Sequence, residues 1–147
     1  MSKVPEGALS TVILVIAAGR RLQERMEERL GDIGLSVRLF SALGHLSHDA
    51  DLSYSDLARR AGVTSQSMRA TVLLLEERGA VERTLQGQGH RARLELTDEG
   101  RALLARARAL VAELDAEFLA DADEEAKGAL EEACRGVLGS AFPGRAR

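Results

Sequence analysis

The side chains best suited to contact a charged partner lie between residues 64 and 93. Residues 64–69 carry hydroxyl and amide groups and end in a guanidinium: Thr64, Ser65, Gln66, Ser67 and Arg69. A glycine-rich stretch further on is followed by an imidazole and two more guanidiniums, His90, Arg91 and Arg93. Such groups form the hydrogen bonds that base edges and phosphates offer. These residue types favour contact with a nucleic acid.

The flanking sequence predicts two short helices joined by a tight turn. Ser53 and Asp56 have the spacing of a capping box at a helix start, and Gly62 is typical of a helix end. Thr64 is expected to cap the second helix, which Gly79 closes. The second half of that helix is expected to supply a core face, from Val72, Leu73, Leu74 and Leu75.

Two short strands are predicted after this helix. Arg91 and Arg93 are separated by two, so a strand places both on one face, while Leu94 and Leu96 turn inward. His90 lies at the predicted tip of this hairpin. Two helices with a tight turn and a two-stranded wing are typical of a winged helix-turn-helix, whose second helix enters a DNA groove. This lobe is predicted to span residues 35–97.

Long helices are predicted at both ends of the chain, because apolar residues recur there at helical spacing. Residues 7–30 form one such segment and residues 98–139 the other, the latter broken near Asp123. The stripe of the second segment begins with Leu103, Ala107, Leu110, Leu114 and Phe118. These faces exceed what a small winged helix buries, so we expect dimerisation helices in a homodimer. The alternative is a helical cap on a monomer.

The predicted fold class is therefore mainly α with a small β wing, a winged helix-turn-helix with N- and C-terminal dimerisation helices in one domain, residues 1–147. The chain has 147 residues, 45% of them hydrophobic, enough for one compact core.

The formal net charge of the chain is −3, divided as 0 over residues 1–50, +1 over 51–96 and −4 over 97–147. Only the lobe that would read DNA is positive, and weakly so. Phosphate contact would depend on local cations.

Several function classes lack their usual signals. No apolar run approaches the roughly 20 residues of a membrane span, and the longest, Val12–Ala18, is also short for a signal peptide, so we expect a cytoplasmic protein without membrane contact. The single cysteine, Cys134, provides no intramolecular disulfide. There is no phosphate loop, nucleophile elbow or run of metal ligands. We therefore expect no catalytic residue, metal or cofactor, and no enzyme.

Three segments resemble the MarR family of bacterial transcriptional regulators. They are GLSVRLFSALGHL, LSYSDLARRAGVTSQSMRATVLLLEERGAVER and LTDEGRALLARARALVAELDAEFLADADEEAKGAL. The resemblance runs from about Leu9 to Leu138, and the LT-x-x-G-R-x-LL-x-x-A spacing makes it specific. It implies a homodimer, a palindromic operator in double-stranded DNA and usually repression. It often implies release by a small, frequently phenolic or oxidised, ligand.

The sequence also departs from the pattern of this family. The wing of family members usually carries an Asp that steadies an Arg in the minor groove, whereas Gln88, Gly89, His90 and Arg91 stand here. The groove role would fall to Arg91 or to His90. The reactive N-terminal Cys of the peroxide sensors and the Trp of urate-responsive members are both absent.

A small aromatic ligand is a further expected partner. The aromatic and imidazole groups at and after the second helix are the candidates for its site: Phe40, His45, His48 and Tyr54. Alternatively, Phe40 belongs to the core and the two histidines are solvated. The rival function is a winged helix that contacts proteins and binds no DNA, which the weak charge and the missing wing Asp favour.

Overall fold

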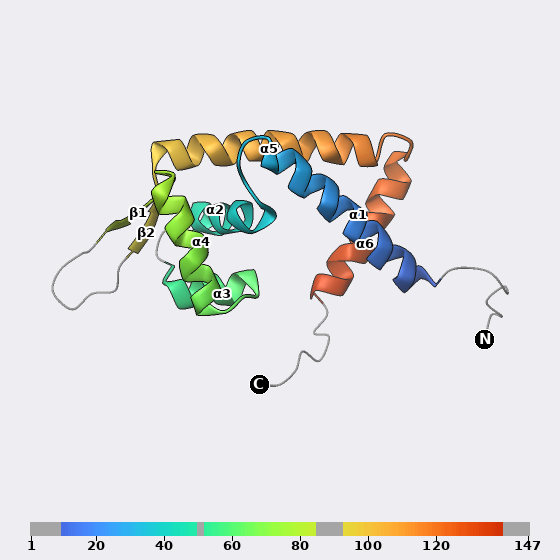
Figure 1. The fold of residues 1–147 in the computed structure, drawn as a ribbon. Helices are drawn as coiled ribbons and strands as arrows, with labels where there is room; N and C mark the ends of the chain where they lie inside the picture. Colours follow the sequence, from blue (N-terminus) through green and yellow to red (C-terminus); the bar gives the residue numbers. More distant parts are fainter. Residues whose placement is uncertain (1–9, 50–51, 85–92, 140–147) are drawn as a thin grey trace, which may run out of the picture. The chain divides into compact units, whose positions relative to one another are not determined.

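The computed structural model describes residues 10–49, 52–84 and 93–139 (Figure 1). It contains six helices and two strands in these ranges: α1 (Thr11–Gly31), α2 (Val37–His48), α3 (Tyr54–Ala61), α4 (Ser65–Glu77), β1 (Val81–Thr84), β2 (Arg93–Leu96), α5 (Asp98–Phe118) and α6 (Glu124–Gly139). The predicted fold class, mainly α with a small β wing, is confirmed. The chain divides into two compact units, Met1–Val111 and Ala112–Arg147. The division falls within α5, and the extent of the predicted domains stays a prediction.

The first unit contains the hydrophobic core. Helices α2, α3 and α4 contact one another, and α2 and α4 also contact the strands. The largest fully buried side chains of these helices include Leu43, Leu57, Met68 and Leu75. Strands β1 and β2 pair antiparallel from Val81 opposite Leu96 to Thr84 opposite Arg93. Leu94 and Leu96 are buried, which confirms the predicted inward face of β2. The helix-turn-helix and its wing are thus one packed unit.

The predicted helix boundaries follow from local hydrogen bonds. The Ser53 hydroxyl accepts from the backbone N–H of Asp56, whose carboxylate accepts from the N–H of Ser53, so the capping box is present. Thr64 caps α4 by accepting from the backbone N–H of Ser67 at 3.1 Å. Gly62 and Gly79 follow α3 and α4 with φ of 68° and 71°, a conformation that glycine adopts without strain. These predictions are confirmed.

The expectation that four consecutive residues of α4 face the core was wrong for two of them. Val72 and Leu75 are fully buried, but Leu73 and Leu74 are 53% and 51% exposed. A helix turns about 100° per residue, so four consecutive side chains cannot share one face. The core face instead follows helical spacing, through Met68, Thr71, Val72 and Leu75.

The apolar stripe of α5 agrees only in part with the predicted one. Leu104 and Ala107 are buried, whereas Leu103 is half-buried and Phe118 is 47% exposed. Arg108 links this helix to α2 by donating to the Ser47 hydroxyl at 3.0 Å. The N-terminal half of α5 therefore packs against the core through Leu104 and the predicted Ala107, with the predicted Leu103 partly buried beside them.

Large apolar side chains remain exposed on the terminal helices of a single chain. The N-terminal half of α1 presents Val12, Ile13, Leu14, Val15 and Ile16, each 49% to 66% exposed. Helix α6 has no buried residue and presents Leu130, Val137 and Leu138. Neither these helices nor any other in the described ranges is long and apolar enough to cross a membrane.

Candidate nucleic-acid interface

The start of α4 presents polar side chains to solvent. Ser65 and Gln66 are exposed in the first turn, Arg69 is exposed one turn later, and Ser67 is half-buried. Thr64 is exposed, and its hydroxyl oxygen serves as the cap acceptor. The free N–H groups and the positive end of the helix dipole lie at this same end. Thr64 and the four residues singled out on α4 thus lie together around a helix start that favours an anionic partner.

Arg69 is held against an aromatic ring. Its guanidinium carbon lies 5.2 Å from the centroid of the Tyr54 ring at the start of α3, within cation–π distance. None of the ion pairs among the described residues involves Arg69. Its charge is therefore available to an external acceptor.

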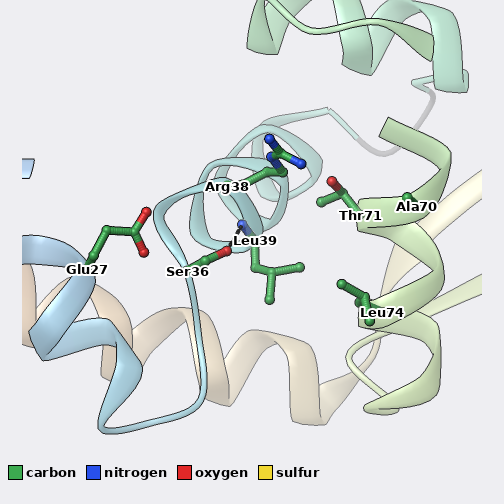
Figure 2. Close-up of a pocket in the computed structure, with 7 residues that line it drawn as sticks. All are labelled: Glu27, Ser36, Arg38, Leu39, Ala70, Thr71 and Leu74. Carbon is green, nitrogen blue, oxygen red and sulfur yellow. Dashed lines mark hydrogen bonds between the residues drawn. The ribbon is translucent and has the colours of Figure 1, made fainter. Parts of the chain in front are cut away.

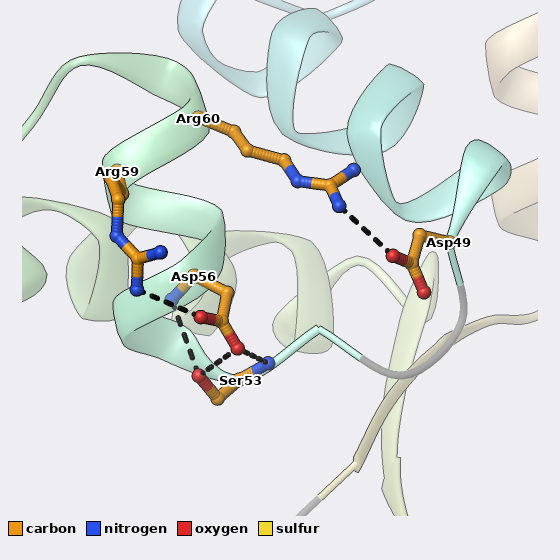
Figure 3. Close-up of polar contacts among 5 residues, drawn as sticks. All are labelled: Asp49, Ser53, Asp56, Arg59 and Arg60. Carbon is orange, nitrogen blue, oxygen red and sulfur yellow. Dashed lines mark hydrogen bonds and ion pairs between the residues drawn. The ribbon is translucent and has the colours of Figure 1, made fainter.

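Two further arginines of α3 carry local partners (Figure 3). Arg59 pairs with Asp56 at 2.9 Å, and Arg60 pairs with Asp49 at 3.0 Å. The hydrogen bonds from Ser53, followed by the charge of Arg59, hold the pKa of the Asp56 carboxyl below its ordinary value. The two arginines reach in different directions, each toward its own carboxylate (Figure 3).

The wing is described only in part. Arg93 begins β2 and is half-buried, whereas His90 and Arg91 lie outside the described residues. A cation that was not singled out from the sequence, Arg83 of β1, donates to the Tyr54 hydroxyl at 2.6 Å. Its partner lies 29 positions away in sequence, so no local pattern marks it.

The expected ligand residues do not line either of two surface hollows. Phe40 packs against the core, His45 is half-buried, His48 is exposed, and Tyr54 contacts arginines. One hollow, of about 430 Å³, is lined by Arg20, Gln23, Glu24 and Glu27 of α1. No group of three residues that could hold a metal ion occurs in the described ranges.

The other hollow lies among α1, α2 and α4 and has a volume of about 350 Å³ (Figure 2). Its lining combines apolar side chains with one cation and one carboxylate: Glu27, Ser36, Arg38, Leu39, Ala70, Thr71 and Leu74. Glu27 also accepts from the backbone N–H of Val37 at 3.2 Å. Leu74 forms part of the apolar lining of this hollow. Its exposure had not been expected from the sequence pattern.

The fold and this polar helix start define a winged helix-turn-helix protein, and comparisons with known proteins specify which kind. A profile of the MarR family matches residues 33–92. The HTH-type transcriptional repressor Rv2887 of Mycobacterium tuberculosis is 38% identical over 108 residues, which cover 73% of this chain and 78% of that protein. The chain therefore belongs to the MarR family of transcriptional regulators, as its resemblance had predicted.

Solved structures agree with this assignment. The complex of Rv2887 from M. tuberculosis with DNA matches with a TM-score of 0.78 and 33% identity, covering 90% of this chain and all of that one. The complex of the same protein with salicylic acid matches with a TM-score of 0.72 and 31% identity, covering 90% and 98%. MepR of Staphylococcus aureus, at 17% identity and a TM-score of 0.74, covering 89% and 98%, shares the fold.

Proposed function

We propose that this regulator is a homodimeric repressor that binds a palindromic operator with helix α4 of each copy. The observation that carries the proposal is the exposed polar start of α4, with Arg69 lacking a carboxylate partner in the described structure. The relative Rv2887, crystallised with DNA, supports it. The proposal places the protein in the cytoplasm with its operator and assigns it no catalytic step.

Each proposed contact follows from side-chain chemistry. Arg69 would pair with guanine or phosphate, and the hydroxyl and amide groups of Ser65, Gln66 and Ser67 would hydrogen-bond to base edges or phosphates. Thr64 would hold the helix start against the phosphate backbone. The wing would add the imidazole of His90 and the cations Arg91 and Arg93. Arg91 would favour narrow A·T-rich minor grooves, where the negative potential is enhanced.

A second copy of the chain would cover the apolar surfaces on the terminal helices. Five consecutive large residues of α1, Val12–Ile16, are exposed in one chain, as are Val137 and Leu138 of α6. Apolar area of this kind usually lies in an interface. A two-fold dimer would present two copies of α4 to major grooves about 34 Å apart, one helical turn of DNA.

The direct test is DNA binding by the purified protein. An operator would be selected from genomic fragments, and affinities for it and for a scrambled duplex would be measured by fluorescence anisotropy. We expect Arg69→Ala to weaken operator binding by about 1–3 kcal/mol if Arg69 pairs with guanine. The matched control is Arg106→Ala, which removes one charge from an exposed position of α5.

A salt titration separates the regulator from a winged helix that only contacts proteins. A DNA-binding protein loses affinity linearly on a log–log plot as phosphate counterions are released. Absence of such binding, or an unchanged operator affinity in all four alanine variants of Ser65, Gln66, Ser67 and Arg69, would refute the proposal.

We further propose that the hollow lined by Arg38 and Leu74 takes a small aromatic acid. Its volume of about 350 Å³ lies within the range of ligand sites. A carboxylate would pair with Arg38, and a ring would contact Leu39 and Leu74. The Rv2887 structure with salicylic acid supports this ligand class. The ligand would touch α4 itself, so occupancy and DNA binding would be linked through one helix.

Salicylate is the probe for this site. Titration calorimetry should show binding to the wild type that is weakened at least tenfold by Arg38→Ala, while Arg25→Ala on α1 binds normally. Salicylate should also lower operator affinity of the wild type more than that of Arg38→Ala. Equal binding by the two variants would exclude this hollow as the site.

A further inference from the structure

Tyr54, the first residue of α3, lies against two guanidinium groups. Arg69 of α4 is 5.2 Å from its ring centroid, and Arg83 of β1 is 5.5 Å from the same centroid. The three residues come from separate elements of the first compact unit. Tyr54 is half-buried, so its ring is supported by the fold.

Arg83 is fixed by two polar contacts. One terminal nitrogen donates to the Tyr54 hydroxyl at 2.6 Å, and Nε lies 3.3 Å from the Glu76 carboxylate. The Glu76 side chain is only 21% exposed, which shields this ion pair more than the pairs of α3. Glu76 thus orients Arg83, and Arg83 holds the hydroxyl of the tyrosine.

Arg69 differs from Arg83 because its contact with Tyr54 leaves its N–H donors free. A cation–π contact with an aromatic ring uses the positive charge of a guanidinium and none of its N–H groups as hydrogen-bond donors to an acceptor atom. Arg69 makes no described hydrogen bond, so those donors remain available. A long side chain held in this way loses less rotational freedom when it binds a partner.

We propose that Tyr54 is a positioning residue for Arg69, and that Glu76 and Arg83 hold Tyr54 in place. The tyrosine itself contacts no DNA in this arrangement; it orders the arginine of α4 before the operator arrives. The inference rests on the proposed function, because its effect is measured as operator affinity. It goes beyond that function by making residues of α3 and β1 determinants of readout by α4.

A double-mutant cycle tests the coupling. Operator affinities are measured for the wild type, Tyr54→Leu, Arg69→Ala and the double variant. We expect Tyr54→Leu to weaken binding about three- to tenfold in the wild-type background. In the Arg69→Ala background the same change should have less than a twofold effect, because no arginine remains to be positioned.

Two conservative variants separate positioning from folding. Tyr54→Phe keeps the ring and its contacts with both guanidiniums but loses the hydrogen bond from Arg83 to the hydroxyl, so we expect a loss of about twofold. Glu76→Gln should give a loss of similar size. Thermal unfolding of each variant shows whether it is folded at the assay temperature. The slope of affinity against salt should be unchanged in Tyr54→Leu, because the tyrosine neutralises no phosphate.

The outcomes distinguish the inference from the function on which it rests. Additive losses from Tyr54→Leu and Arg69→Ala would overturn the positioning role, as would full affinity in Tyr54→Leu when Arg69→Ala binds weakly. Failure of the wild type to bind DNA with a salt-dependent affinity would instead overturn the proposed function.

Discussion

A Cβ atom built on Gly100 would lie 1.9 Å from the carbonyl oxygen of Ala80, so the start of α5 lies closer to the residue after the α4 turn than any side chain permits. The neighbouring Thr97 donates its hydroxyl to the Gly79 carbonyl at 2.5 Å and its N–H to the Ala80 carbonyl at 3.1 Å. The end of α4 is thereby joined to the beginning of α5. The glycine of the LTDEGR segment is needed for this approach.

We expect Gly100→Ala to destabilise the protein by about 2–4 kcal/mol, because its methyl group must displace backbone. Urea denaturation at one protein concentration measures the change. The matched control is Gly128→Ala in α6, where nothing lies within 4 Å of the added Cβ. That change should be neutral or stabilising by up to about 1 kcal/mol, since alanine favours a helix. Equal stability of the two variants would contradict the close approach.

The capping box of α3 predicts a pH dependence of stability. The hydrogen bonds from Ser53 and the charge of Arg59 lower the pKa of Asp56 in the folded state. The folded protein therefore favours the ionised form, and the stabilisation is present above the unfolded pKa and is lost as pH falls through the lowered folded pKa. Asp56→Asn should lower the melting temperature at neutral pH, and the difference from the wild type should shrink in acid.

The exposed Asp115 of α5 provides the charge control for this measurement. Asp115→Asn should change the melting temperature little at neutral pH. A difference between wild type and Asp56→Asn that stays constant down to pH 2 would show that the carboxylate charge is not what stabilises the helix start.

The exposed apolar half of α1 predicts that assembly is lost when a charge is placed there. Ile16 is 51% exposed in one chain, and Ile16→Glu would bury a carboxylate in the proposed interface. Sedimentation at micromolar concentration should give about twice the chain mass of 15.8 kDa for the wild type and a shift toward the single-chain mass for the variant. Arg21→Glu, at a side chain 88% exposed, is the control. A monomeric wild type that binds its operator specifically would contradict the dimer.

The hydrogen bonds of Arg78 are expected to stabilise the folded protein. This residue follows α4 and donates through its terminal nitrogens to the carbonyls of Ile33, at 3.1 Å, and Gly34, in the turn between α1 and α2. Arg78→Ala should cost about 1–2 kcal/mol in urea denaturation, because the contacts are charge-assisted hydrogen bonds. Arg78→Lys keeps the charge but lacks the planar pair of donors, and should recover only part of the loss. Full stability of Arg78→Ala would exclude this role.

The boundaries of the helices could be predicted from the sequence because they depend on residues three or four positions apart. The capping groups of Ser53, Asp56 and Thr64 act on N–H groups of their own helix, and Gly62 and Gly79 adopt their φ locally. The helix-turn-helix, its strands and the polar start of α4 follow from these signals. The family was predicted from the resemblance of three longer segments, and the comparisons confirm it.

Other features depended on packing between distant segments. Helical rotation turned Leu73 and Leu74 outward, and Leu74 then became a wall of a hollow shared with Glu27 and Arg38, far away in sequence. Neither the cation–π contact of Arg69 with Tyr54 nor the approach of Gly100 to Ala80 can be predicted from local sequence spacing. Sequence alone predicted the groups that we propose contact DNA, because side-chain chemistry and helix caps are local. Tertiary structure decided how those groups are held, because their supports are brought together only by folding.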